Sequence, residues 1–472
     1  MCLRPIYIKD RSVYHSAHYS SEGYEVPCGC CAECRALKQQ EWETRISFEI
    51  SDLYKRGGQA IFLTFTYSDS TLPHYIDKAF GIDTVAFRHK DVLGFLNRLK
   101  VQVHKLYGKG SYKYFFVSEY GKDTKRPHYH ALFFLEPGVD FTRFTETARK
   151  AWSYGFTFPK FNKHLNMYVD NYNVASSPLI RSKAGGSSYV AKYITKDMSF
   201  FGKPDVSEYI QHPLNKFRMK EFLPKHWQSN GLGASIVDKI SSMNDVEVKD
   251  VLCNGIVNPL SFKRVPLPSY AVNKLFYKSV KFGRVNSDNK PLYDRILTPF
   301  AQQYMQVTFV HRLYKTAHKM YTFFHSISQQ PLDILPIHWH LLNKLENKPL
   351  SYFVKPALYH HFLFHANKHV IHDLCENQWV YAVDMFKPEN VAPLWLKSKD
   401  PLYRVRHPLG VVCSFDYLSP RVNEHRIHTI LSLYYLLSRD LRSWQLSERQ
   451  KDFDEKQRLK RLFASRYNKK YC

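Results

Sequence analysis

One short stretch restricts the folds open to this chain more than any other. It is RPHYHALFF, residues 126–134, in which two histidines stand one residue apart and lead into an apolar run. Side chains two apart on a β-strand point to the same face of its sheet, so His128 and His130 share a face with Leu132 and Phe134. The residues between them are also mostly apolar and face the other way. This pattern predicts a buried strand with the histidine pair at its start.

Strands and helices alternate around this stretch. Short β-branched and aromatic runs predict strands, and apolar residues repeating every three to four positions predict helices. The expected elements are a helix over 35–56, a strand over 60–69, a helix over 87–108, strands over 111–121 and 128–138, and a helix from about 144. We therefore expect a Cys-rich N-terminal segment with its helix over 1–57, a catalytic domain over 58–250, and a basic, aromatic- and His-rich, mainly helical region over 251–472.

The net charge points to a polyanionic partner. Lysine and arginine number 68 against 42 aspartates and glutamates, a formal charge of +26, and 15% of the residues are aromatic. Cations release counterions when they contact phosphates, and aromatic rings stack on the bases of single strands. A solubilising basic surface is the alternative. No apolar run is long enough to span a bilayer, and the N-terminus has no secretory pattern, so we expect no membrane partner.

A carboxylate is expected beside the histidine pair. The preceding predicted strand ends near Glu119, and a hairpin that sets Glu119 across from either histidine also puts it on their face. Two imidazoles and one carboxylate could bind a divalent metal, Mg²⁺ or Mn²⁺, and leave positions open for a substrate oxygen. Histidines at a strand end without any metal are the other interpretation.

A second segment carries candidate nucleophiles. SSYVAKYITKD, residues 187–197, begins with serines that can cap a helix. Tyr189 and Tyr193 then project from one helical face, with Lys192 and Lys196 on a neighbouring face. A tyrosine needs nearby cations to react as phenolate, because its ordinary pKa is near 10. An ordinary packed helix is the alternative.

The cysteines are clustered near the N-terminus. Four of the nine lie in CGCCAEC, which includes Cys28, Cys31 and Cys34. An odd total with this clustering argues against a disulfide framework. Structural Zn²⁺ bound by these thiols and free thiols packed in a turn both remain open.

Three motifs in order, FLTFTYSD, PHYHALFF and YVAKYITK, resemble the HUH endonuclease family of rolling-circle nickases. The spacing of the two tyrosines resembles the replication initiators of microviruses, small phages with circular single-stranded DNA. CGCCAECR resembles a Cys-rich stretch of one branch of that family. The motifs cover about residues 2–205, with weak continuation to about 270.

The resemblance implies a fold, a chemistry and partners. The fold would be α+β, an HUH core of antiparallel sheet with flanking helices, followed by the mainly helical C-terminal region. His128, His130 and Glu119 would bind the metal, and Tyr189 or Tyr193 would attack the origin phosphodiester. Lys192, Lys196 and Arg126 would contact DNA or neutralise charge.

The same resemblance implies a place of action. The chain would work on single-stranded origin DNA in the cytoplasm of a host bacterium. Host helicase and DNA polymerase would be needed, since no phosphate-binding GxxxxGK[ST] motif is present. A non-catalytic single-stranded-DNA-binding or packaging protein is one alternative, and a tyrosine transposase of the same catalytic family is another.

Overall fold

The computed structural model describes residues 6–9, 23–27, 32–121, 126–180, 212–285, 291–329, 342–354 and 356–357, with single positions elsewhere, most of them between 433 and 459. The chain divides into two compact units. One is Arg35–Val272, and the other combines Met1–Cys34 with Asn273–Cys472. The predicted boundaries at 57 and 250 stay predictions; the helix expected at 35–56 belongs to the same unit as the strands that follow it.

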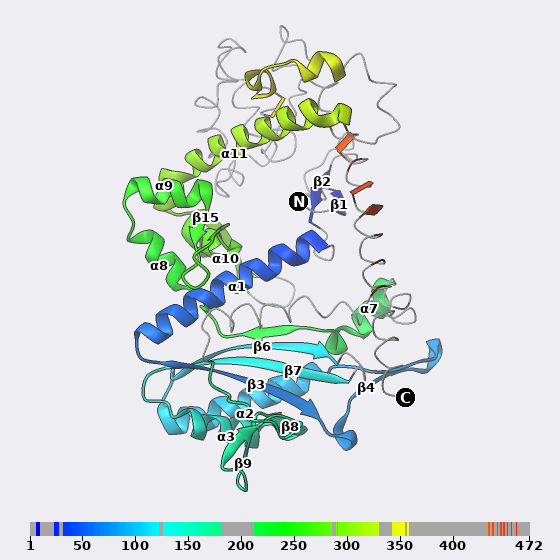
Figure 1. Cartoon of the computed structure of the whole chain (residues 1–472), viewed down its shortest axis with the longest axis vertical. Helices are drawn as coiled ribbons and strands as arrows, with labels where there is room; N and C mark the ends of the chain where they lie inside the picture. Colours follow the sequence, from blue (N-terminus) through cyan, green and yellow to red (C-terminus); the bar gives the residue numbers. More distant parts are fainter. Residues whose placement is uncertain are drawn as a thin grey trace. The chain divides into compact units, whose positions relative to one another are not determined.

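A five-stranded antiparallel sheet forms the centre of the Arg35–Val272 unit (Figure 1), in the order β11-β6-β7-β3-β8. Its strands are β3 (Gln59–Tyr67), β6 (Tyr112–Tyr120), β7 (Pro127–Leu135), β8 (Gly155–Phe158) and β11 (His226–Gln228). The expected α+β class, an antiparallel sheet with flanking helices, is confirmed.

Helices cover both faces of the sheet (Figure 1). Helix α1 (Ala32–Lys55) packs its apolar stripe, which includes Trp42 and Ile46, on the face that carries Leu132 and Phe134. Helices α2 (His89–Tyr107) and α3 (Phe141–Ala151) pack on the opposite face, around Phe65. Both faces of β7 are therefore buried over most of its length, as its apolar run predicted.

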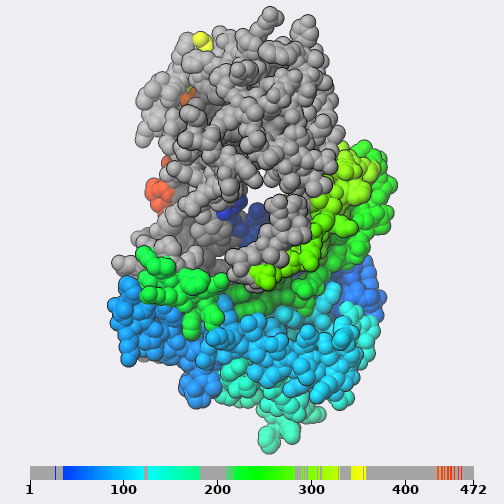
Figure 2. Space-filling view, turned by 180° about the vertical axis from the view of Figure 1, so that it is seen from behind, coloured from blue at the N-terminus to red at the C-terminus, as the bar shows by residue number. Residues whose placement is uncertain are grey.

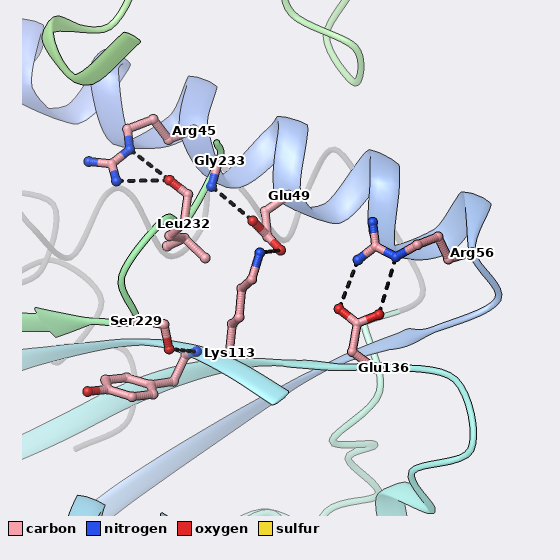
Figure 3. Close-up of polar contacts among 9 residues, drawn as sticks. Arg45, Glu49, Arg56, Lys113, Glu136, Ser229, Leu232 and Gly233 are labelled. Atoms are coloured by element: carbon pink, nitrogen blue, oxygen red, sulfur yellow. Dashed lines mark hydrogen bonds and ion pairs between the residues drawn. The ribbon is translucent and has the colours of Figure 1, made fainter. Parts of the chain in front are cut away.

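Polar contacts fix α1 over the sheet (Figure 3). Lys113 Nζ of β6 lies 2.7 Å from Glu49 Oε1, and Glu49 Oε2 accepts a hydrogen bond from Gly233 N at 2.9 Å. Arg45 donates two hydrogen bonds to the Leu232 carbonyl, of 2.8 and 3.1 Å. Because Glu49 is buried, both of its oxygens need partners, and the sheet and the chain after β11 supply one each.

Gly233 is required for this close approach. A Cβ added there would lie 2.7 Å from Arg45 O, at a φ of +72°. We expect Gly233→Ala to lower the free energy of unfolding by about 2–3 kcal/mol, measured by thermal or chemical denaturation. Gly110→Ala is the control, because Gly110 has a similar φ of +81° with nothing within 4 Å. Equal losses in the two variants would contradict the close-contact explanation.

Smaller elements complete this unit. Two hairpins leave the sheet, and the β9–β10 hairpin projects at its edge (Figures 1 and 2). The hairpin strands are β4 (His74–Asp77), β5 (Ile82–Val85), β9 (Lys160–Asn162) and β10 (Met167–Val169). The later elements are α7 (Pro213–Arg218), α8 (Ser235–Ser241), α9 (Asp245–Asn254), β12 (Ile256–Val257), β13 (Arg264–Val265) and α10 (Ser269–Phe276). Short 3-10 helices lie at Asp69–Thr71, Lys78–Phe80 and Lys220–Phe222.

The other unit contains both helix and strand. Its long helix α11 (Pro299–Ser326) begins at Thr298, whose hydroxyl accepts a hydrogen bond from Ala301 N at 3.1 Å. Its strands pair as two antiparallel hairpins, β1 (Ile6–Lys9) with β2 (Gly23–Val26), and β14 (Tyr277–Val285) with β15 (Pro291–Leu297). The β14–β15 hairpin was not expected in a region that looked mainly helical. None of the helices in the described ranges is both long and apolar enough to cross a membrane.

Candidate metal centre

Glu119, His128 and His130 meet on one face of the sheet. Strands β6 and β7 pair so that Glu119 lies directly opposite His128. Glu119 Oε2 is 2.8 Å from His130 Nε2 and 3.4 Å from His128 Nε2, and the possible ligand atoms of all three lie within 4.8 Å of one another. The predicted register is confirmed. Their assignment as metal ligands stays a prediction.

Backbone and hydroxyl partners orient both imidazole rings. His128 Nδ1 lies 3.2 Å from the Arg126 carbonyl oxygen, and since a carbonyl only accepts, this nitrogen donates. A neutral His128 therefore presents its Nε2 lone pair toward Glu119. His130 Nδ1 lies 3.0 Å from Thr64 Oγ1, a hydroxyl that can donate or accept. Metal-binding histidines are held through the second ring nitrogen in this way.

The donor set fits a divalent cation. Two imidazole nitrogens and one carboxylate oxygen converge on one point of the sheet face. Glu119 and His130 are buried, whereas His128 keeps 19% of its side chain exposed. A buried carboxylate facing an imidazole lone pair is unfavourable unless a positive charge lies between them. A bound cation supplies that charge and leaves coordination positions on the exposed side.

Residues behind the site fix β7 and were not predicted from the sequence. Tyr129, between the two histidines, faces the opposite side and shares a 3.1 Å hydrogen bond with Tyr67. Tyr67 donates to Asp91 at 3.1 Å, and Arg88 pairs with the same carboxylate at 3.0 Å. Burial raises the pKa of both tyrosines well above the ordinary value. Both hydroxyls therefore stay protonated, and neither buried tyrosine can serve as a phenolate nucleophile.

Thr64 was also missed, although its signal is in the sequence. It lies in FLTFTYSD, two residues from Thr66, so strand periodicity puts both threonines on one face. The register of β3 then sets Thr64 opposite His130 and Thr66 opposite His128. Only the pairing of β3 with β7, rather than with another strand, was beyond the sequence pattern.

Arg126 already has partners in the structure. Its guanidinium lies 2.5 Å from Asp69 Oδ1 and donates to the Tyr67 carbonyl at 2.9 Å. These contacts join the end of β3 to the start of β7 and help to place the His128 backbone. Because Asp69 is almost fully exposed, a phosphate could replace it. The predicted role of Arg126 in DNA contact stays a prediction.

His226 lies on the same face, in line with His130 across β6. Both pair with Val117, one from each side. Burial, with Lys38, Lys225 and Arg45 nearby, lowers the pKa of His226 to about 4. Its ring packs edge-on against Trp42 of α1. At two strand spacings, about 10 Å, it is too far from His130 to share a metal.

Several predicted residues lie outside the described part of the chain. They are the tyrosines and lysines at Tyr189, Lys192, Tyr193 and Lys196, and the cysteines at Cys28 and Cys31. Cys34, in the first turn of α1, is described and is half-buried. The proposed zinc site therefore stays a prediction.

Residues 60–198, which include the three site residues, match the ORF2 family of phage-type replication-associated proteins. Replication-associated protein ORF2 of Spiroplasma virus 4 is 30% identical over 199 residues, which cover 36% of this chain and 59% of the relative. Replication-associated protein VP4 of Bdellovibrio phage phiMH2K is 27% identical over 237 residues, covering 48% of this chain and 66% of the relative. No solved structure matches the chain.

These matches confirm the resemblance to phage replication proteins that the sequence motifs indicated. In both relatives the similarity covers less than two thirds of the relative's own length. The matched region supports a role in DNA replication. The HUH type of the core, the nicking chemistry and the metal requirement go beyond the matches.

Proposed function

We propose that this protein initiates rolling-circle DNA replication as an HUH-type endonuclease, nicking and rejoining single-stranded origin DNA. The observation that carries the proposal is the convergence of Glu119, His128 and His130 on one face of an antiparallel sheet. This cluster lies within the stretch that matches the replication-associated family. A purely DNA-binding or packaging protein would have no use for such a cluster.

The chemistry is a transesterification. Glu119, His128 and His130 would hold Mg²⁺ or Mn²⁺, which when bound polarises a phosphodiester oxygen and stabilises the developing charge. The phenolic oxygen of Tyr189 or Tyr193 forms a bond to phosphorus while the bond to the 3′ oxygen breaks. The phenol loses its proton and the 3′ oxygen gains one, leaving a 3′-OH primer and a 5′-phosphotyrosine. Lys192 and Lys196 would favour the phenolate. No ATP is needed, because one ester replaces another.

The tyrosine segment is long enough to reach the cluster. Ile180 is tied to β3, since its N–H donates to the Ala60 carbonyl at 3.0 Å. From Ala60 to Thr66, which lies opposite His128, the strand advances about 20 Å. The stretch from Ile180 to Tyr189 can span up to about 30 Å when extended. Either tyrosine is therefore within reach of a phosphate bound at the cluster.

The proposal includes partners and a location. Nicking supplies a primer and strand separation is a separate task, so host helicase and DNA polymerase would complete replication. The protein would act in the cytoplasm of a host bacterium. The +26 formal charge supports a nucleic-acid partner.

Metal removal tests the proposal. Labelled single-stranded DNA, tiled from the replicon that encodes this chain, should be cleaved in Mn²⁺ or Mg²⁺ and left intact in EDTA, with binding retained. Glu119→Gln, which keeps the side-chain shape, should raise the metal concentration for half-maximal cleavage by at least about tenfold. Glu136→Gln is the matched control, because Glu136 pairs with Arg56 instead. Undiminished cleavage in EDTA would contradict the proposal.

Salt dependence tests the role of the positive charge. Each phosphate that the protein neutralises on a single strand should lower log affinity by about 0.7 per unit of log salt. We expect a steep slope in titrations of labelled oligonucleotide at increasing NaCl, because cations outnumber anions by 26. A flat response would show that the surplus charge serves something other than DNA.

A further inference from the structure

The edge strand β8 carries two phenylalanines on the same sheet face as the metal cluster. β3 pairs with β7 on one side and with β8 on the other, so Thr66 lies between His128 and Phe156. In the next row of this face, Thr64 lies between His130 and Phe158. Two strand spacings, about 10 Å, separate each phenylalanine backbone from the histidine in its row.

The burial pattern of β8 is the reverse of an ordinary edge strand. Phe156 is 59% exposed and Phe158 is half-buried, while polar Thr157 between them is buried. Among the described residues, Thr157 Oγ1 has no hydrogen-bond partner. A strand selected for stability alone would place the aromatic rings inside and the threonine outside. Local violations of this kind are expected at functional sites.

β8 is held firmly against β3. A Cβ on Gly155 would lie 2.3 Å from the Thr66 carbonyl oxygen and 2.5 Å from Ser68 N, so only glycine allows the two backbones this close. Trp152, just before β8, donates from its indole to the same Thr66 carbonyl at 3.0 Å. The two phenylalanines therefore have a fixed position relative to the histidine pair.

A cation completes the arrangement. Lys160, at the start of β9, places Nζ 5.9 Å from the centre of the Phe158 ring. The β9–β10 hairpin that carries it projects from this edge (Figures 1 and 2). Exposed rings beside an ammonium group are what single-stranded nucleic acid recognises, because bases stack on the rings while the cation neutralises the backbone.

We propose that Phe156 and Phe158, together with Lys160, form a base-stacking site for single-stranded DNA beside the metal cluster. A nucleotide next to the scissile phosphate would stack there, so the site would fix the register of the strand over His128 and His130. This second part rests on the proposed nicking function; stacking itself does not.

The other candidate occupant of this edge is a strand from a second copy of the chain. Edge strands pair readily with other chains, and exposed phenylalanines favour such contacts. Charge favours DNA instead, since Lys160 and Lys163 would face their own copies across such an interface in a chain of net charge +26. Oligomeric state is therefore part of the test.

The test measures affinity of the full-length protein for fluorescein-labelled oligo(dT), which requires no origin sequence and no cleavage. Phe156→Ala should weaken binding about tenfold, equivalent to about 1.4 kcal/mol and within the range of about 1–3 kcal/mol for one stacked base. Phe156→Trp should retain affinity, whereas Phe156→Leu should lose it, because leucine keeps apolar area without a ring. Phe262→Ala is the matched control, as Phe262 is 80% exposed elsewhere in the same unit.

Photocrosslinking gives a second readout. Oligonucleotides with a single iododeoxyuridine should crosslink to residues 156–158, as identified by mass spectrometry. Unchanged affinity of Phe156→Ala, equal losses in Phe156→Ala and Phe262→Ala, or a change of oligomeric state with unchanged affinity would each overturn the stacking site. The outcome is independent of nicking. The His128→Ala/His130→Ala variant should bind oligo(dT) normally, so absence of cleavage with intact stacking would count against the proposed function alone.

Discussion

Replacing His128 and His130 together by alanine should abolish cleavage of single-stranded origin DNA while DNA binding is largely retained. The cluster is the only group of three close metal-ligand side chains among the described residues, so its loss removes the bound cation. A metal acting as Lewis acid contributes several kcal/mol to the transition state, and each 1.36 kcal/mol is a factor of about ten in rate. The cleavage rate measured on labelled DNA should therefore fall by at least about a thousandfold.

The control removes two other histidines. His74 is exposed on β4 and His104 lies in the last turn of α2, and neither belongs to the cluster. The His74→Ala/His104→Ala variant should cleave normally. Both double variants should show the same circular dichroism and affinity for oligo(dT), which excludes misfolding as the cause. Undiminished nicking by His128→Ala/His130→Ala would refute the assignment of the site.

The cluster could be predicted from the sequence because all of its determinants are local. His128 and His130 share a face through the two-residue period of a strand. Glu119 lies on the adjacent strand of the same hairpin, and any even shift of register keeps it on their face. The structure selects one of these registers, Glu119 opposite His128. The helices α1 and α2 were predicted for the same reason, since their apolar stripes repeat within a few turns.

Contacts between distant segments could not be predicted. β11 completes the sheet by pairing His226 with Val117, and Gly233 reaches Glu49 from 184 positions away. Nothing in a three-residue strand shows a period, so its partner depends on the packed tertiary structure. β8 was missed for a different reason. Its exposed Phe156 and buried Thr157 invert the usual pattern, so hydrophobic periodicity would have assigned its faces wrongly.

A covalent bond between tyrosine and DNA is the largest effect still to be tested. A tyrosine nickase must become joined to the 5′-phosphate, whereas a binding protein or a hydrolase that uses water never does. Incubation with single-stranded origin DNA and Mn²⁺ should give an adduct that survives denaturation. Mass spectrometry should locate it at Tyr189 or Tyr193. The buried Tyr67 and Tyr129, whose raised pKa keeps them protonated, should remain unmodified.

Substitutions divide the roles of the two tyrosines. Phenylalanine at Tyr189 or at Tyr193 should weaken the adduct or move it to the other residue, because four positions along a helix place both on one face. Phenylalanine at both should remove the adduct and leave metal binding intact, since only two hydroxyls are lost. Tyr172→Phe is the matched control, because Tyr172 is 80% exposed yet lies outside the 187–197 segment.

Joining two cleaved ends should require both tyrosines. After the first nick one of them is occupied as a phosphotyrosine ester, so only the second can attack the newly made junction. The first ester is then free to receive the released 3′-OH, which closes a circle without an external energy source. A nucleotide attached outside 187–197, or efficient nicking without any adduct, would refute the mechanism. Rejoining by either single-phenylalanine variant at the normal rate would refute the division of labour alone, because one tyrosine would then suffice for both transfers.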